Sequence, residues 1–491
     1  MNEAVIQGLK PERVWHYFNE ISAIPRGSKN EKAVLEYIKK TAEAMGLKSK
    51  QDKVGNVVVM KPASPGKENS TTIILQVHTD MVCEKNRDVQ HDFLKDGIKF
   101  RREGNCIKAE GTTLGSDDGI GVASLLTFLE DKSLVHGPVE GLFTVDEETG
   151  LTGANFVAPG FITGKIMMNL DSEDEGVLYI GCAGGEDTMI TIPAKKKAVT
   201  GKVAILNVMV RGLKGGHSGV DIHLGRANAL KLLTRTLLAI DAKTKMKLVS
   251  LEGGSKHNAI PREADATIVV PPADEKKVRK IAADCETIFL NAFKSVDPGV
   301  KVVVEEGKKA KSQRDRQSFD DATKKKVLGT LAALPHGVIR MSSDIPDLVE
   351  TSTNVAVVRT ERAGVVIVTS QRSSIESEKE MIAAQVAAVG QLAGAKIKVS
   401  DGYPGWQPNV SSAVLMKGKE VYKNLFGKEP AVKAIHAGLE CGIINDRVGG
   451  DVDTISFGPT IIGPHSPDEK VEIESVEKFY RFLTEMVKAV G

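Results

Sequence analysis

Three apolar runs, each ending in a polar cluster, constrain the fold of this chain most strongly. The runs "TTIILQV", "EGLFTV" and "GKIMMNL" have the length of buried strands, and helix-like stretches such as residues 118–131 lie between them. Strands that alternate with helices predict a mostly parallel sheet. The first part of the chain is therefore predicted to be an α/β domain.

The sequence changes character after "YIGCAGGED", where a lysine run follows and strand patterns come in pairs. We predict an α/β domain in two segments, residues 1–187 and 403–491, with an α+β domain inserted at residues 188–402. The inserted domain repeats a pattern of strands and helices, which predicts an internal duplication joined by the polar stretch "EEGKKAKSQRDRQSFDD".

Composition excludes several classes of partner and location. The chain of 491 residues carries 66 basic and 64 acidic residues, and its net charge of +2 is too small to attract it to nucleic acid or to a membrane surface. Its five cysteines form no CxxC pair, and no segment has the length and apolarity of a signal peptide or a membrane span. A cytoplasmic protein that acts on small molecules is expected.

Polar residues that directly follow the apolar runs are the candidates for chemistry, because ligands of open parallel sheets bind beyond the carboxyl ends of the strands. Any one of them alone is more often a cap or a surface residue. Together with a late loop, they form a set: His78 and Asp80, Asp117 and Asp118, Glu147 and Glu148, Asp171, and His465.

Histidines and carboxylates are the ligands that Zn²⁺ takes, and two ions need one bridging carboxylate plus further ligands for each. Three carboxylates against two divalent ions leave a net positive charge, which favours a metal-activated water. Glu147 is then free to act as a base. The five predicted ligands are His78, Asp117, Glu148, Asp171 and His465.

The motifs "HTDMVCEKN", "GTTLGSDDGIGVAS", "EETGLTGA", "NLDSEDEGVLYIGCAGG" and "GGHSGVDIHLGRANA" resemble the di-zinc metallopeptidase family of dipeptidases, aminoacylases and glutamate carboxypeptidases, most closely its dipeptidase branch. The resemblance covers essentially the whole chain. It implies that Asp117 bridges the ions, that Asp80 orients His78, that Glu147 is the general base, and that a cis peptide bond follows Asp117.

The resemblance also implies that the inserted domain is a lid that contacts the substrate. His217 would stabilise the oxyanion, Asn258 would contact the substrate, and Arg372 would grip its carboxylate, although Arg372 also fits a solvated strand position. Glu440 is interpreted as the group that holds a free α-amino group. His436 beside it is interpreted as structural.

The function implied is hydrolysis of unblocked dipeptides, including Xaa-His substrates such as β-alanyl-histidine, by a hydroxide held between two divalent ions. Zn²⁺ is expected, with Co²⁺ or Mn²⁺ as alternatives. Two other functions stay open: removal of acyl groups or carboxypeptidase action on N-acyl amino acids, and binding without catalysis. A homodimer in which His217 acts across subunits, and a single chain that supplies His217 itself, both fit the sequence.

Overall fold

The computed structural model describes residues 2–307 and 317–491, and the chain divides into two compact units. Unit 1 comprises Met1–Gly181, Trp406–Ala434 and Leu439–Gly491, and unit 2 comprises Cys182–Gly405 and Ile435–Gly438. The long segment of unit 2 begins and ends close to the predicted insertion, whereas the short segment was not indicated by the sequence. Residues 308–316, part of the predicted joint, lie outside the described residues.

Unit 1 combines a large sheet, a small sheet and several helices. Its helices are α1 (Glu3–Ile6), α2 (Glu12–Ser22), α3 (Lys32–Ala44), α4 (Ser116–Glu130), α5 (Glu147–Gly150), α6 (Thr152–Asn155), α11 (Ala413–Phe426), α12 (Glu440–Arg447) and α13 (Ile473–Val490). Its strands are β1 (Lys48–Gln51), β2 (Val57–Lys61), β3 (Ile73–His78), β4 (Phe100–Glu103), β5 (Cys106–Ala109), β6 (Val139–Thr144), β7 (Ile166–Asn169), β8 (Val177–Cys182), β22 (Ala431–Ile435), β23 (Asp453–Ser456), β24 (Ile461–Ile462) and β25 (Lys470–Glu472).

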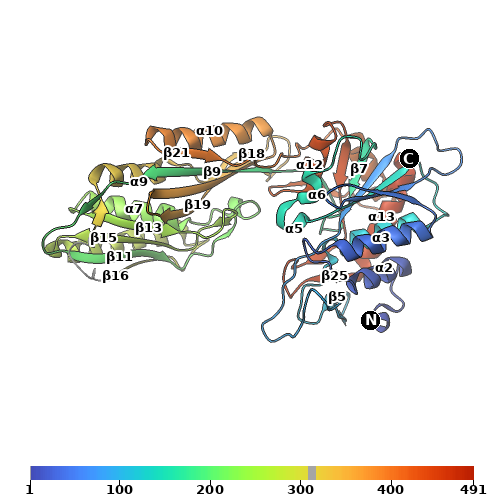
Figure 1. Cartoon of the computed structure of the whole chain (residues 1–491), viewed down its shortest axis with the longest axis horizontal. Helices are drawn as coiled ribbons and strands as arrows, with labels where there is room; N and C mark the ends of the chain where they lie inside the picture. The colour runs from blue at the N-terminus through green and yellow to red at the C-terminus, as the bar shows by residue number, and fades with distance from the viewer. Residues whose placement is uncertain (1, 308–316) are drawn as a thin grey trace. The chain divides into compact units, whose positions relative to one another are not determined.

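The large sheet of unit 1, of which β7 is labelled in Figure 1, is parallel at its centre. Its strand order is β1-β2-β6-β3-β7-β23-β8-β22. β3 runs parallel to β6 and β7, and β7 runs parallel to β23, whereas β1, β2 and β8 join the sheet through antiparallel pairs. The predicted parallel arrangement therefore describes the four central strands, whereas β1, β2 and β8 pair antiparallel.

Burial explains why the central strands read as continuous apolar runs. Every residue of β3 and of β6 is buried, as expected for parallel strands that are covered on both faces. α4 packs against β3, α2 packs against α4, and α11 packs against β23. The small sheet, in the order β24-β25-β5-β4, connects the C-terminal loops to residues 100–109.

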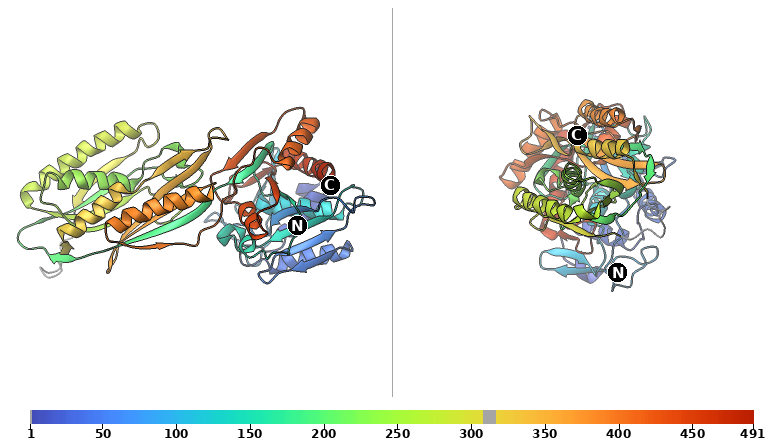
Figure 2. Two further views of the ribbon diagram at one scale, coloured as in Figure 1. Left: turned by 90° about the horizontal axis from the view of Figure 1, so that it is seen from above. Right: turned by 90° about the vertical axis from the view of Figure 1, so that its left-hand side faces the viewer.

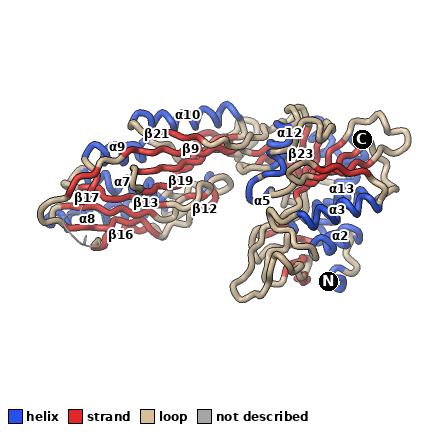
Figure 3. The backbone as a smooth tube through the Cα atoms, viewed as in Figure 1, coloured by secondary structure: helices blue, strands red, loops and turns tan. Residues whose placement is uncertain are grey.

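Unit 2 is built on one long antiparallel sheet, whose strands are drawn in red in Figure 3. Its helices are η1 (Ile222–Leu224), α7 (Ala229–Asp241), η2 (Pro272–Asp274), α8 (Glu275–Phe293), α9 (Asp321–Ala333) and α10 (Glu376–Leu392). Its strands are β9 (Gly184–Pro193), β10 (Lys196–Ala198), β11 (Ala204–Arg211), β12 (Gly216–His217), β13 (Lys247–Gly253), β14 (Ala259–Ile260), β15 (Ala264–Val270), β16 (Lys301–Glu306), β17 (Gln317–Phe319), β18 (Gly337–Met341), β19 (Val349–Thr360), β20 (Gly364–Ser373) and β21 (Lys396–Val399).

The strand order of unit 2 confirms the internal duplication. The sheet runs β16-β11-β15-β13-β19-β20-β9-β21, so the first half read from one edge matches the second half read from the other, strand for strand. β9 takes the place in the second half that β11 takes in the first, although it precedes the whole first half in the sequence. The first strand of the second copy, β9, therefore comes from the segment of the chain that precedes the first copy.

The four long helices of unit 2 pack side by side. α8 contacts α7, α7 contacts α9, and α9 contacts α10, while α7 packs against β11 and α10 against β9 (Figure 2). One hydrophobic core lies between this helical layer and the sheet. Within the described parts of both units, no helix combines the length and apolarity that crossing a membrane requires.

Candidate metal centre

The predicted ligands of unit 1 gather where the central strands end. In the parallel register His78 lies beside Thr144, and Gln76 lies beside Asn169, so β3, β6 and β7 end at the same edge of the sheet. Glu147 and Glu148 open α5 just after β6, and Asp171 follows β7. The polar residues that follow the apolar strands therefore lie together at this edge of the sheet.

Two groups of ligand atoms form there and share Asp117. His78 Nε2 lies 3.0 Å from Asp117 Oδ1 and 3.2 Å from Asp171 Oδ1. His465 Nε2 lies 3.1 Å from Asp117 Oδ2 and 3.0 Å from Glu148 Oε2. Asp117 therefore offers one oxygen to each group, which is the arrangement that a carboxylate bridging two ions requires.

The spacing of these atoms fits divalent cations. An ion with bonds of about 2.0–2.1 Å in tetrahedral geometry holds its ligand atoms roughly 3.3 Å apart. The second oxygen of Glu148, Oε1, is buried and has no hydrogen-bond partner among the described residues. A buried carboxylate oxygen without a partner is costly unless a cation is bound nearby.

Asp80 joins the predicted ligand His78 to the predicted base. Its Oδ1 lies 3.3 Å from His78 Nδ1, at ion-pair distance, and accepts a hydrogen bond of 3.0 Å from the Glu147 N–H. Its Oδ2 accepts hydrogen bonds from Ser28 Oγ at 2.8 Å and from the Glu148 N–H at 3.3 Å. One buried carboxylate therefore lies at ion-pair distance from His78 and accepts hydrogen bonds from both N–H groups that open α5.

The pKa values of the site reflect carboxylates crowded around two histidines. Burial lowers the pKa of His78, but Asp171 and Asp117 raise it well above its ordinary value in total. Hydrogen bonds to Asp117 and Glu148 raise the pKa of His465 to about 11. Burial raises the pKa of Asp171 to about 7. These raised pKa values mean that the cluster holds protons when no cation is bound, because its negative charge needs a positive partner.

The predicted base, Glu147, lies within the same cluster. Its carboxylate belongs to a group with His78 and Glu148 whose ligand atoms all lie within 4.8 Å of one another. Burial, followed by the charges of Asp171 and Glu148, raises the pKa of Glu147 well above its ordinary value. The Asp117-Asp118 peptide bond is cis, as the resemblance implied.

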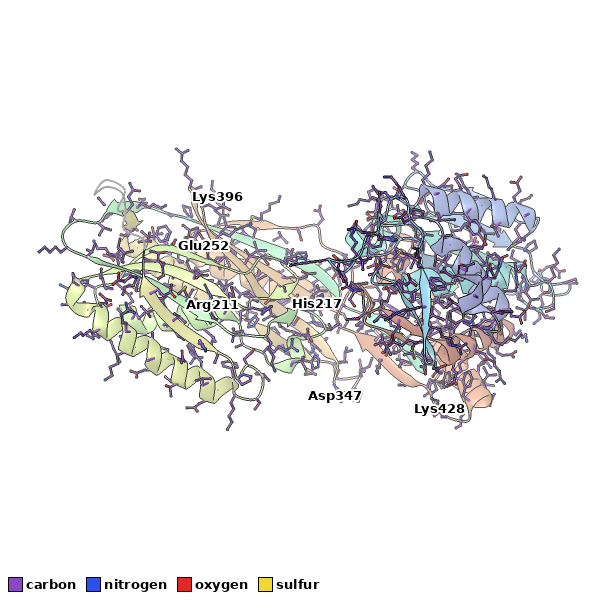
Figure 4. All side chains as sticks on the ribbon, turned by 90° about the horizontal axis from the view of Figure 1, so that it is seen from below. Arg211, His217, Glu252, Asp347, Lys396 and Lys428 are labelled. Carbon is purple, nitrogen blue, oxygen red and sulfur yellow. The ribbon has the colours of Figure 1, made fainter. Side chains whose placement is uncertain are left out.

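His217, labelled in Figure 4, belongs to unit 2 and is held in one tautomer. Its Nδ1 accepts hydrogen bonds of 3.2 Å from the N–H groups of Gly219 and Val220. Burial, with the nearby charge of Arg372, lowers its pKa to about 4. The ring is therefore neutral at pH 7, and its proton is on Nε2.

Arg372 lies near His217 in unit 2 and is buried rather than solvated. It lies within β20, among other buried residues, and its Nη1 donates a hydrogen bond of 2.8 Å to the hydroxyl oxygen of Tyr403. Its Nε has no hydrogen-bond partner in the described part of the chain. The residue therefore keeps a donor for a ligand, which the alternative of a solvated strand arginine does not explain.

Asn258 and His436 lie in the same region of unit 2. Ser218 N donates to Asn258 O at 2.9 Å, so Asn258 adjoins the strand that ends at His217. Ser352 Oγ and His436 Nε2 form a hydrogen bond of 2.7 Å, and burial lowers the pKa of His436 to about 3. Their roles toward a substrate stay predictions.

Glu440 begins α12 in unit 1 and is completely buried. Its Oε2 accepts hydrogen bonds of 2.6 Å from Gln76 Nε2 and from Thr144 Oγ1, while Oε1 has no partner among the residues described. Burial raises its pKa to about 8. An amino group would reach Oε1 only after a rearrangement, so the predicted role of Glu440 stays a prediction.

Comparisons with known proteins identify the class. The family model described as "Peptidase dimerisation domain" (M20_dimer) matches residues 208–297, in the first half of the unit 2 sheet. The aminopeptidase PepT of Bacillus cereus shares the fold, with a TM-score of 0.56, 18% identity and coverage of 98% of this chain and 99% of that chain. The fold and the family model together define the class as an M20 peptidase, and the ligand groups of unit 1 form a candidate site for divalent cations.

Two relatives define the branch. The crystal structure of aminoacylhistidine dipeptidase from Vibrio alginolyticus is 40% identical, with a TM-score of 0.89 over 99% of this chain and 98% of that chain. The cytosol non-specific dipeptidase of Escherichia coli (strain K12) is 40% identical over 482 residues, which is 98% of each chain. The chain belongs to this dipeptidase family of peptide-bond hydrolases, and the resemblance drawn from the motifs is confirmed.

Some residues with contacts at these sites were not singled out from the sequence. Tyr403 lies in "YPGWQP", which marked only a domain boundary, and Ser28 lies in the loop that separates two helices. Arg26 and Glu469 lie next to predicted ligands but carry no motif of their own. The one available signal is that Glu469 follows His465 by four residues in "GPHSPDE".

Proposed function

We propose that this chain hydrolyses unblocked dipeptides at the centre in unit 1. The observation that carries the proposal is the division of Asp117 between two ligand groups, one with His78 and Asp171 and one with Glu148 and His465. Such a site would hold two divalent cations, which polarise a carbonyl and lower the pKa of water when bound.

The residues of the chain would handle the protons. Glu147 takes a proton from the attacking water and passes it to the leaving amine, a role supported by its place within 4.8 Å of the ligand atoms of His78 and Glu148. Asp80 keeps Glu147 in position by accepting a hydrogen bond from the Glu147 N–H. Zn²⁺ is the proposed ion, with Co²⁺ or Mn²⁺ as alternatives, because every donor is nitrogen or oxygen.

The residues of unit 2 would recognise the substrate. A neutral His217 donates through Nε2 to the oxyanion, and its pKa of about 4 supports this form. Arg372 binds the carboxylate, for which its unpartnered Nε is suited. Asn258 and Glu440 are proposed contacts to the peptide and to the free amino group.

Activity on a free and a blocked dipeptide tests the proposal. The protein is stripped with a chelator, reloaded with Zn²⁺, and assayed with alanyl-histidine and with its N-acetylated form. We expect no turnover without metal and faster cleavage of the free dipeptide. Faster cleavage of the blocked compound would favour the deacylase or carboxypeptidase alternative, and bound metal without any hydrolysis would favour the non-catalytic one.

Assembly and location are further parts of the proposal. The matching dimerisation domain supports a homodimer, which sedimentation of the full chain would test. The name of the Escherichia coli relative supports a cytoplasmic location. β-Alanyl-histidine is proposed among the substrates because the Vibrio relative is named for aminoacyl-histidine.

A further inference from the structure

A buried arginine and a buried glutamate lie on the two sides of one peptide group in unit 1. Arg26 and Glu469 are each 2% exposed. Arg26 Nη2 donates a hydrogen bond to Gly115 O, and the Ser116 N–H, in the same peptide group, donates to Glu469 Oε1 at 2.7 Å. The positive residue therefore meets the negative end of the peptide dipole, and the negative residue meets the positive end.

Glu469 binds the whole start of α4. Its Oε2 accepts hydrogen bonds from the N–H groups of Leu114 at 2.8 Å and Gly115 at 3.1 Å. Its Oε1 also accepts from Ser116 Oγ at 2.6 Å. N–H groups at the start of a helix have no partner within the helix, and a carboxylate that accepts several of them is bound strongly.

Arg26 binds a second segment that carries residues of the metal centre. Its Nη1 donates to Thr79 O at 3.1 Å and to Asp80 O at 2.8 Å, in the loop that directly follows His78. Gly115 has a φ of +69°, and a Cβ there would lie 2.7 Å from Arg26 Nη2. Only glycine therefore allows the guanidinium to lie this close to the peptide.

We propose that Arg26 and Glu469 are positioning residues that fix the bridging carboxylate Asp117 relative to the other ligands. The proposal rests on the two-cation function proposed above. Asp117 directly follows the bound peptide group, so any movement of that group moves both of its oxygens. Because each oxygen belongs to a different ligand group, loss of the contact weakens both cation sites together.

Glu469 also connects this peptide group to the His465 loop. The Glu469 N–H donates to Ser466 O at 3.0 Å, one residue after the predicted ligand. The next residue, Lys470, begins β25 and lies opposite Lys108 of β5 in the small sheet. This strand pair holds the chain in place directly after Glu469. Three segments that carry predicted ligands, at the end of β3, at the start of α4 and before β25, therefore meet at the Gly115-Ser116 peptide.

The test is Co²⁺ binding to metal-free protein carrying Glu469→Gln. The amide nitrogen cannot accept, so at least one of the three N–H groups loses its acceptor and the charge is lost. We expect affinity at both sites to fall about 10 to 100-fold, with a changed visible spectrum of bound Co²⁺. The matched control is Glu140→Gln. Glu140 is 7% exposed and accepts from Thr163 N at 2.7 Å, Gly164 N at 3.0 Å and Thr163 Oγ1 at 2.9 Å.

Glu140 lies at the opposite end of β6 from the metal centre, so a purely structural role predicts that both variants lower the melting temperature and that neither changes Co²⁺ affinity. That result would overturn the proposal. Should Glu469→Gln not fold, Ser116→Ala removes one donor only, and we expect about 2 to 10-fold weaker binding; unchanged affinity would again count against it. A wild-type chain that binds no Co²⁺ would instead refute the two-cation function.

Arg26→Lys tests the other side of the contact. Lysine keeps the charge but loses the fork that reaches both the Thr79-Asp80 segment and Gly115. We expect Co²⁺ affinity to fall about tenfold in the folded variant. Wild-type affinity with the lysine in place would show that the charge alone suffices and that Arg26 does not position the ligands.

Discussion

Replacement of Asp80 by asparagine tests how far the metal centre depends on a residue that binds no cation itself. The best orientation of the amide leaves its oxygen where Oδ1 was, facing His78 Nδ1 and the Glu147 N–H. The amide nitrogen then faces Ser28 Oγ, which can turn to accept, and the Glu148 N–H, which cannot. The variant keeps its shape but loses one acceptor and the charge beside His78.

The size of the effect follows from these losses. A hydrogen bond to a charged group contributes about 1.5–3 kcal/mol, and residues that orient a metal ligand typically change affinity or activity about 10 to 100-fold. The pKa of Asp80 gives a similar figure. Burial opposes ionisation, yet His78, Ser28 and the Glu147 N–H lower the pKa to about 2, which corresponds to about 2 kcal/mol at pH 7.

This contribution has a defined pH window. Because the pKa of Asp80 is lower in the folded chain than in the unfolded one, its stabilisation is full above about pH 4 and is lost as the pH falls toward 2. At pH 7 the stabilisation by Asp80 is complete. From the lost hydrogen bond and charge, we expect Asp80→Asn to lower Zn²⁺ affinity and kcat each by about 10 to 100-fold at this pH.

The assay is Zn²⁺ titration of metal-free protein with a competing chelator, followed by turnover of alanyl-histidine. Asp453→Asn is the matched control, since Asp453 also accepts from a serine hydroxyl, Ser412 Oγ at 2.6 Å, and from a backbone N–H, Val414 at 3.0 Å. Asp453 begins β23, at the end of the sheet away from the metal centre. Unchanged affinity and turnover in Asp80→Asn, or equal losses in Asp453→Asn, would refute the reasoning.

Three further predictions concern the base, the carboxylate contact and acid stability. Glu147→Gln should bind Zn²⁺ normally and lose at least about 100-fold in kcat, and near wild-type turnover would exclude it as the base. Arg372→Lys should raise KM about tenfold or more, while Arg211→Lys, also at a strand position of unit 2, should leave KM unchanged. The pKa of His436 is about 3 in the folded chain, below its value in the unfolded chain, so the folded state is most stable toward this group above about pH 6.5 and loses stability as the pH falls. The melting temperature of His436→Gln should therefore fall less between pH 7 and pH 5 than that of the wild type. Equal falls would contradict this prediction.

The fold could be predicted where the signal was local. β3 and β6 are buried along their whole length, so their sequences are largely apolar and end abruptly at His78 and before Asp146. The duplication in unit 2 was visible because its strands and helices repeat in order. β9 was not assigned to the second copy, because that copy is completed by a strand that precedes the first one, and only the sheet order reveals it.

The metal centre was predictable for a related reason, and its supporting residues were not. Histidine and carboxylate side chains bind cations through atoms that other residue types lack, so their positions after strands carried information. Arg26 and Glu469 bind backbone carbonyl and N–H groups, which every part of the chain has, and they leave no corresponding pattern of residues at Gly115 and Ser116 beyond the glycine itself. Contacts of this kind become visible only when segments distant in sequence meet, which is why ligands can be read from a sequence more readily than the residues that hold them in place.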